Sequence, residues 1–169
     1  GMAMMLKELR RTALRTIQLL VGADVLPPHR SVTQWSGGFS GAMGRIACQF
    51  GDFHFNVTSA SDVYAQDLGV LARHIPNISL AGYWWHTLHP FYIRKSLETR
   101  LDMVPMNKII AYFSDAYHAE WCYPKLRLVK QILEGILVER IDKGWYDIDT
   151  AIDIINKLFY ENPKSIYGL

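Results

Sequence analysis

Short apolar runs alternate with longer amphipathic stretches along most of this chain. Continuous apolar runs bounded by glycine or proline are typical of strands buried on both faces, whereas apolar residues spaced three and four apart are typical of helices. The pattern predicts helices over residues 3–14, 39–50, 61–74, 90–101, 120–143 and 149–160. It predicts strands over residues 16–21, 53–58, 78–84 and 108–114. This alternation indicates an α/β fold, with a parallel sheet and flanking helices.

The predicted elements follow one another closely, so residues 1–169 are expected to form a single domain. The longest connection covers residues 23–38 and contains two prolines and two glycines. It is predicted to be a loop at the carboxyl end of the first strand, the side of a parallel sheet that carries functional loops.

Composition narrows the class of protein. Half of the 169 residues are hydrophobic, a fifth are charged and the net charge is +2, as in a soluble globular protein. There is no block of lysine and arginine to bind nucleic acid, and no apolar run of about 20 residues to cross a membrane. Cys48 and Cys122 are isolated, which favours reduced thiols and a cytoplasmic location.

Candidate chemistry lies just beyond the third and fourth predicted strands, because reactive groups of parallel sheets collect at the carboxyl ends of strands. Asp115 ends an otherwise apolar strand, and a carboxylate in that setting needs a cation, a proton or hydrogen-bond donors. Asp115 is therefore a candidate site residue. The alternative interpretation is a cap on the following helix.

Two tryptophans, Trp84 and Trp85, follow the third strand. Alternate residues of a strand face opposite sides, so one ring is expected to fill the core and the other to line a pocket. The pattern does not distinguish which ring does which.

Three histidines lie near these strand ends. His86, His89 and His118, together with Asp115, form a set of nitrogen and oxygen ligands that zinc accepts. Exposed loop histidines are the competing interpretation, because an HxxH spacing often arises by chance. His54 alternates with two phenylalanines in the second strand and is expected to be a structural histidine.

Several of these stretches resemble the carboxyl-terminal part of the uronate isomerase family. They are GYWW at residues 82–85, LDMVPMNKIIAYFSDAY at residues 101–117 and NPKSIYGL at residues 162–169. That family belongs to the amidohydrolase superfamily of metal-dependent (β/α)8 TIM barrels. The resemblance implies that this chain corresponds to barrel strands five to eight. It also implies a divalent metal such as zinc, with Asp115 as a metal ligand that takes part in proton transfer, and one tryptophan against a sugar acid.

The chain departs from the family pattern in three places. Tyr117 stands where many members have an arginine that binds the substrate carboxylate, and tyrosine cannot form that bidentate, charged contact. The HxH metal motif occurs nowhere in the chain, and Leu20 replaces a family histidine. We therefore expect a uronate isomerase-like protein that is inactive as this isolated chain. The alternative is a non-catalytic half-barrel that serves as an interaction module.

A half-barrel would have two open strand edges and an uncovered inner face. Open edges pair readily, and large apolar patches rarely remain in water. A homodimer is therefore expected, or a complex with a chain that supplies the missing half-barrel.

Overall fold

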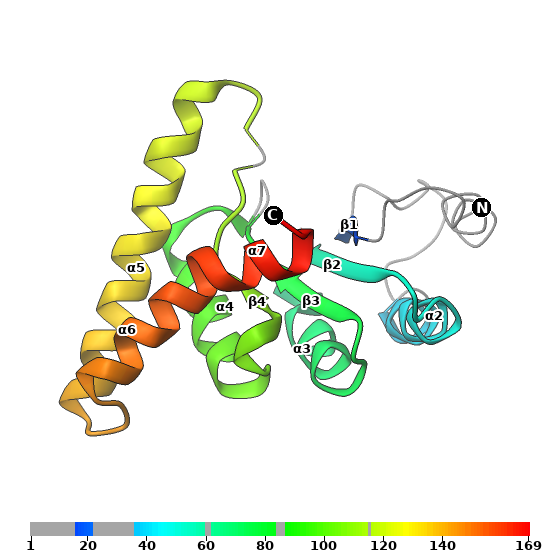
Figure 1. The fold of residues 1–169 in the computed structure, drawn as a ribbon, viewed down its shortest axis with the longest axis horizontal. Coiled ribbons are helices and arrows are strands. Elements are labelled where there is room, and N and C mark those ends of the chain that lie inside the picture. Colours follow the sequence, from blue (N-terminus) through cyan, green and yellow to red (C-terminus); the bar gives the residue numbers. More distant parts are fainter. Residues whose placement is uncertain (1–15, 22–35, 60–61, 84–86, 115) are drawn as a thin grey trace.

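Four parallel strands form one sheet in the computed structural model of this protein (Figure 1). The structure describes residues 16–21, 36–59, 62–83, 87–114 and 116–169. The strands lie side by side in chain order, as β1 (Thr16–Val21), β2 (His54–Ser59), β3 (Ile78–Ala81) and β4 (Ile109–Ile110). The prediction of an α/β fold with a parallel sheet is confirmed.

Six α-helices are present in the described part of the chain. They are α2 (Ser36–Gln49), α3 (Ala65–His74), α4 (Pro90–Met103), α5 (Cys122–Asp142), α6 (Ile148–Asn156) and α7 (Asn162–Tyr167). Local sequence sets their ends. Pro90 occupies the first turn of α4, where its missing N–H is not needed. Gly144 follows α5 with a φ of 69°, and Asp147 caps α6 by accepting a hydrogen bond from the Thr150 N–H at 2.7 Å.

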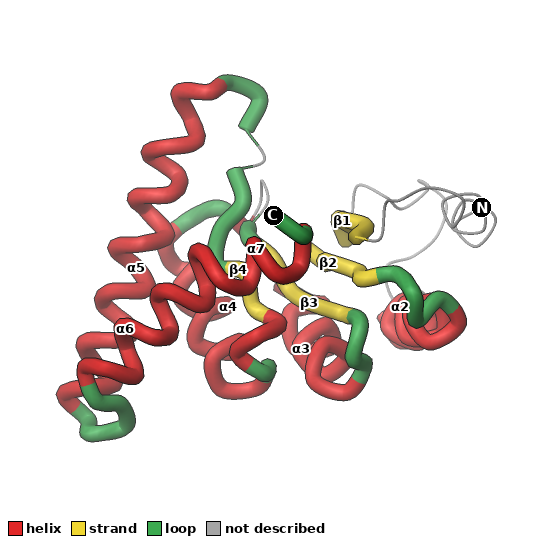
Figure 2. Tube along the Cα trace, in the orientation of Figure 1, coloured by secondary structure: helices red, strands yellow, loops and turns green. Residues whose placement is uncertain are grey.

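One face of the sheet is apolar and packs against helices. The register places Phe55 beside Ile78 and Leu80 beside Ile109, so these side chains share that face. Together with Val57 they join a buried cluster with residues of α3, α4 and α5, among them Leu68, Leu97 and Leu133. Figure 2 shows these helices grouped on one side of the strands. Burial of this cluster is the main source of stability that the structure offers.

The opposite face carries a row of polar side chains. Asn56 and Ser79 lie beside each other, and Asn56 Nδ2 donates to Ser79 Oγ at 2.7 Å. His54 Nε2 is 2.8 Å from the same hydroxyl, so the structure supports a structural role for His54. Tyr167, in the last turn of α7, donates from its hydroxyl to Asn56 Oδ1 at 3.1 Å. The end of the chain therefore covers the polar face of β2 (Figure 1).

β4 is shorter than the strand predicted over residues 108–114. A 3-10 helix, Met106–Lys108, precedes it, and residues 111–114 are not in a strand. β4 pairs with β3 only at Leu80–Ile109 and Ala81–Ile110. β3 itself ends at Ala81 rather than extending to residue 84, because Gly82 leaves the extended conformation with a φ of 43°. Beyond Ala81 the backbone no longer runs as a strand beside β4, and one further hydrogen bond, from the Gly82 N–H to the Ile110 carbonyl, joins the two.

The outer edge of β4 is not open, which corrects the expectation of two open edges. The backbone N–H of Ala111 donates to the Leu158 carbonyl at 3.2 Å, and Asn162 Nδ2 donates to the Ile109 carbonyl at 2.8 Å. Asn162 also donates to the Met106 carbonyl at 2.7 Å. The carboxyl-terminal helices thus satisfy the edge groups that a fifth strand would otherwise use.

The predicted end of the last helix is wrong. Helix was expected to stop at Tyr160, before Asn162 and Pro163. Instead α6 passes into a π-helix, Lys157–Glu161, and α7 continues to Tyr167. Pro163 falls in the first turn of α7, where a missing N–H and the fixed φ of proline are tolerated.

Two smaller differences concern other helix starts. α2 begins at Ser36, inside the predicted loop, with Gly37 and Gly38 in its first turn, where the chain forms few intrahelical hydrogen bonds. α5 begins at Cys122 after a 3-10 helix, Ala119–Trp121. The helix predicted over residues 3–14 lies outside the described residues, as does most of the predicted loop. No helix within the described ranges is long and apolar enough to cross a membrane.

Candidate functional site

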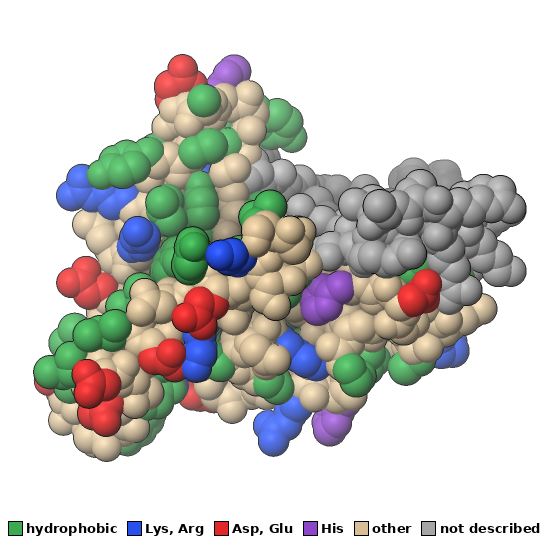
Figure 3. Space-filling model, in the orientation of Figure 1, with side chains coloured by type: hydrophobic (Ala, Val, Ile, Leu, Met, Phe, Trp, Pro, Cys, Tyr) green, Lys and Arg blue, Asp and Glu red, His purple; other side chains and the backbone are tan. Residues whose placement is uncertain are grey.

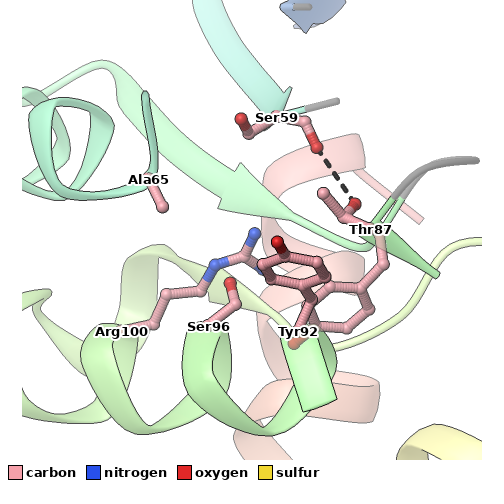
Figure 4. A pocket seen from close by; sticks show the side chains of 7 residues that line it. Ser59, Ala65, Thr87, Tyr92, Ser96 and Arg100 are labelled. Carbon is pink, nitrogen blue, oxygen red and sulfur yellow. Dashed lines mark hydrogen bonds between the residues drawn. The ribbon is translucent and has the colours of Figure 1, made fainter. Parts of the chain in front are cut away.

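The carboxyl ends of β2 and β3 meet at a small pocket between the sheet and α4 (Figure 4). Ser59 is the last residue of β2, and its carbonyl accepts a hydrogen bond from Thr87 Oγ1 at 3.3 Å. Tyr92 and Ser96, from α4, line the same pocket. This hydrogen bond links Thr87, which follows β3 in the chain, to the last residue of β2.

Gly82 shapes the chain where β3 ends. Its N–H donates to the Ile110 carbonyl at 3.1 Å, which extends the hydrogen bonding between β3 and β4 by one residue. A Cβ at this position would overlap the ring of Phe113, and the φ of 43° is one that glycine adopts readily. Gly82 therefore allows the segment after β4 to lie directly against the segment after β3.

Arg100 is the buried charge at this end of the sheet. It is only 7% exposed, and its Nη2 donates to the Gly82 carbonyl at 3.1 Å. Its guanidinium carbon lies 5.0 Å from the centroid of the Tyr83 ring. Burial lowers the pKa of Arg100 and raises the pKa of Tyr83 to about 12, so Tyr83 is neutral at ordinary pH and Arg100 keeps its proton.

An exposed aromatic cluster lies beyond β4, at the start of α5. Tyr117 is 73% exposed, and its ring meets that of Trp121 edge-on at 6.5 Å. His118 contacts the same tryptophan at 5.1 Å between ring centroids. Lys125 Nζ lies 5.6 Å from the Trp121 ring and donates to the Ser114 carbonyl at 3.0 Å. The Lys125 side chain therefore links the first turns of α5 to Ser114.

His89 lies apart from that cluster in its contacts. It is exposed, precedes the first turn of α4, and meets the ring of Tyr92 at 4.5 Å. Among the residues that the structure describes, no three histidine, cysteine, aspartate or glutamate side chains gather closely enough to hold a metal ion. Asp115, Trp84, Trp85 and His86 lie outside the described residues, so their predicted roles remain predictions.

Comparison with known proteins identifies one family repeatedly, although no family model matches the chain. A uronate isomerase from Thermotoga sp. (strain RQ2) is 20% identical over 100 residues, which are 59% of this chain and 22% of the relative. The crystal structure of a uronate isomerase from Bacillus halodurans C-125 is 26% identical, with a TM-score of 0.67. The match covers 75% of this chain and 31% of that one. The chain resembles the uronate isomerases in both sequence and fold.

The uronate isomerase from Thermotoga maritima gives a broader structural match. Its crystal structure matches 98% of this chain with a TM-score of 0.76, at 15% identity, and the match covers 40% of its own length. At that identity the likeness concerns the fold alone. The chain therefore spans between about a fifth and two fifths of the uronate isomerases that it matches.

The described residues do not fit the metal centre that the family resemblance implies. A catalytic zinc typically has three protein ligands, and the described histidines that were candidates, His89 and His118, are exposed and contact different aromatic rings. Burial lowers the pKa of His54, with Lys108 adding to the effect, but its ring is hydrogen-bonded to Ser79. These described residues therefore support no catalytic step through a metal.

Sequence reasoning missed Arg100 and Tyr83. The burial of Arg100 could have been predicted from the hydrophobic pattern of α4. Arg100 follows the buried Ile93 and Leu97 at helical intervals, since these three residues are spaced four and three apart. A charged residue on such a stripe is expected to be buried with a specific partner. Tyr83 was overlooked because it stands beside the two tryptophans, which carried the resemblance to uronate isomerases.

Proposed function

We propose that this chain is a uronate isomerase-like protein whose fold corresponds to the carboxyl-terminal half of a (β/α)8 barrel. The observation that carries the proposal is the structural likeness to uronate isomerases over nearly the whole chain. The sheet supports it as well, because consecutive parallel strands lie side by side with helices α3, α4 and α5 packed on one face. A doubly wound sheet would reverse its strand order, whereas these four strands follow chain order.

The proposed chemistry is the family's, the aldose–ketose isomerisation of a sugar acid. Asp115 is the proposed proton-transfer group and metal ligand, and one of Trp84 and Trp85 is proposed to line the sugar. Tyr117, exposed beside Trp121, would offer the substrate one hydrogen bond in place of an arginine fork. The sequence holds neither the HxH motif nor the strand-five histidine, so we propose that residues 1–169 alone do not isomerise uronates.

The test is an isomerase assay on the purified chain with glucuronate and galacturonate, with and without added zinc. We expect no conversion and no stoichiometric metal by elemental analysis. Metal-dependent conversion that is lost in Asp115→Asn and retained in Asp142→Asn would contradict the proposal of an inactive chain. Asp142 is a suitable control because it is an exposed aspartate at the end of α5.

A non-catalytic role is the second candidate, and one observation favours it. In a closed barrel the last strand pairs with the first, but here Leu158 and Asn162 occupy outer-edge groups of β4. An interaction module would use the fold without the metal. The two candidates are separated by complementation, since only a half-barrel with a catalytic role would gain activity when the amino-terminal half of a uronate isomerase is added.

We propose further that the protein is a cytoplasmic homodimer. β1 is the strand at the other end of the sheet order, and Tyr117, Trp121 and Tyr123 are exposed where α5 begins. Figure 3 shows hydrophobic side chains at the surface over the upper part of α5. Both features favour association. Light scattering at micromolar concentration is expected to give about twice the 19.4 kDa of one chain, and a monomer mass would refute the dimer.

A further inference from the structure

Arg100 is a buried cation for which no carboxylate partner is found in the described part of the chain. Its Nη2 bonds to a backbone carbonyl, whereas its Nη1 is buried and has no hydrogen-bond partner among the residues that the structure describes. The nearby acidic residues of α4 are paired elsewhere, Glu98 with Arg94 and Asp102 with Arg140. A buried charge without a counter-charge strongly destabilises a fold.

A second unpartnered donor lies beside it. Tyr83 is 3% exposed, and its buried hydroxyl finds no hydrogen-bond partner within the described ranges of the chain. The ring of Tyr83 stabilises the Arg100 guanidinium through its π-face, but that contact leaves both polar groups unsatisfied. A guanidinium N–H and a phenol O–H are both donors, so what they lack is an acceptor, and the positive charge favours one that is negative.

The space beside these donors is small. Two cavities, each of about 10 Å³, share Ser59, Ala65, Ser96 and Arg100 in their walls, and Tyr83 lines one of them. Such a volume holds one particle about the size of a water molecule. Figure 4 shows the Arg100 side chain extending from α4 toward Ser96 and the end of β2. Carboxylate and phosphate groups carry several heavy atoms and exceed this space.

We propose that the cavity between Arg100 and Tyr83 binds a chloride ion. Chloride is a single atom and the smallest common anion after fluoride and hydroxide. It accepts hydrogen bonds from guanidinium and hydroxyl groups and neutralises the buried charge. A water molecule could accept a hydrogen bond from each donor but would leave the cation uncompensated. Gly82 and Ser59 bring the ends of β3 and β2 to this point, so the ion would be a structural element that joins two strand ends to α4.

The solution test compares thermal unfolding of the full chain in sodium chloride and in sodium methanesulfonate at equal ionic strength. Methanesulfonate has five heavy atoms, is too large for the cavity and is not a sugar acid. Ligand linkage predicts that the unfolding midpoint is higher in chloride, by about 5–10 °C once chloride reaches roughly one hundred times its dissociation constant. The difference should vanish in Arg100→Gln and persist in Arg94→Gln, because Arg94 is an exposed arginine paired with Glu98 and Glu139. Equal midpoints for the unsubstituted chain in the two salts would refute the proposal.

A second test needs no variant and therefore does not depend on whether Arg100→Gln folds. Crystals of the unsubstituted chain grown in sodium bromide should show an anomalous scattering peak between Arg100 Nη1 and Tyr83 Oη. A cavity without that peak, whether filled by water or by a carboxylate of the chain, would overturn the chloride site. The outcome is independent of isomerase activity, so it stands apart from the proposed function.

Discussion

The hydroxyl of Tyr167 donates a hydrogen bond to Asn56 Oδ1 at 3.1 Å, joining α7 to β2 across 111 residues of sequence. Asn56 is fully buried and its amide nitrogen is already bonded to Ser79. The contact therefore links the last turn of the chain to the polar row on the sheet.

Removing that hydroxyl should destabilise the fold. Tyr167→Phe is expected to lower the free energy of unfolding by about 1–2 kcal/mol, because a buried acceptor loses its partner. Urea denaturation measures the change. Tyr160→Phe is the matched control, since Tyr160 is exposed, and it should change the free energy by less than about 0.5 kcal/mol. Equal effects would argue against the bond to Asn56.

Gly82→Ala should be among the most damaging single substitutions. The added methyl group would overlap the Phe113 ring, and alanine must also adopt a φ of 43°. Gly144→Ala separates the two effects, because Gly144 also has a positive φ but nothing lies within 4 Å of its Cβ position. We expect a loss of about 1–2 kcal/mol at Gly144 and clearly more at Gly82.

The double variant Gly82→Ala/Phe113→Ala tests the cause of that difference. If steric overlap with the ring is responsible, the double variant should be less destabilised than the sum of the two single variants. Strict additivity in urea denaturation would show that the ring of Phe113 is not the obstacle.

The core on the helix side of the sheet depends on α5. Leu133 is buried in it, and Leu133→Ala is expected to cost about 2–5 kcal/mol of unfolding free energy. Val138 lies on the same helix with half of its surface exposed, so Val138→Ala should cost less than about 0.5 kcal/mol. Similar shifts of the denaturation midpoint for the two variants would contradict the observed phase of the helix.

His54 should make stability depend on pH. Burial and Lys108 lower its pKa in the folded protein, so the unfolded chain binds a proton more readily. The contribution of His54 is therefore fully present above its unfolded pKa of about 6.5 and is lost as pH falls through its lower folded pKa. Free energies of unfolding between about pH 5 and 8 should show this loss. His54→Gln should reduce it, whereas His118→Gln, at an exposed position, should not.

Hydrophobic pattern was enough to predict the parallel sheet and most helices, because strands such as β2 are buried along nearly their whole length. It could not predict how short β4 is. The apolar run continues past Ile110, but there Ala111 bonds to Leu158 of the π-helix rather than to a strand. Such a partner is 47 residues away in sequence and leaves no periodic signal.

Parallel-strand logic placed the candidate site beyond the third and fourth predicted strands, and its residues Trp84, Trp85, His86 and Asp115 lie outside the described residues. The pocket that the structure describes lies at the ends of β2 and β3, where Ser59 ends β2 and Tyr83 follows β3. A role for Arg100 in this pocket was not predicted, because its side chain extends to the pocket from the third turn of α4. The hydrophobic pattern of a sequence does not show how far, or in which direction, a side chain extends. The same limit applies to Asn162, whose role depends on two carbonyls more than 50 residues earlier.

Asn162 also sets the order in which the chain can complete its structure during synthesis. The carbonyls of Met106 and Ile109 emerge from the ribosome well before Asn162, at a distance of 53 residues or more along the chain. Until the last helix follows, β4 presents unpaired backbone groups to neighbouring nascent chains, a condition that promotes aggregation. Chaperone dependence during translation should therefore be greatest over the interval in which β4 is complete and α7 is not.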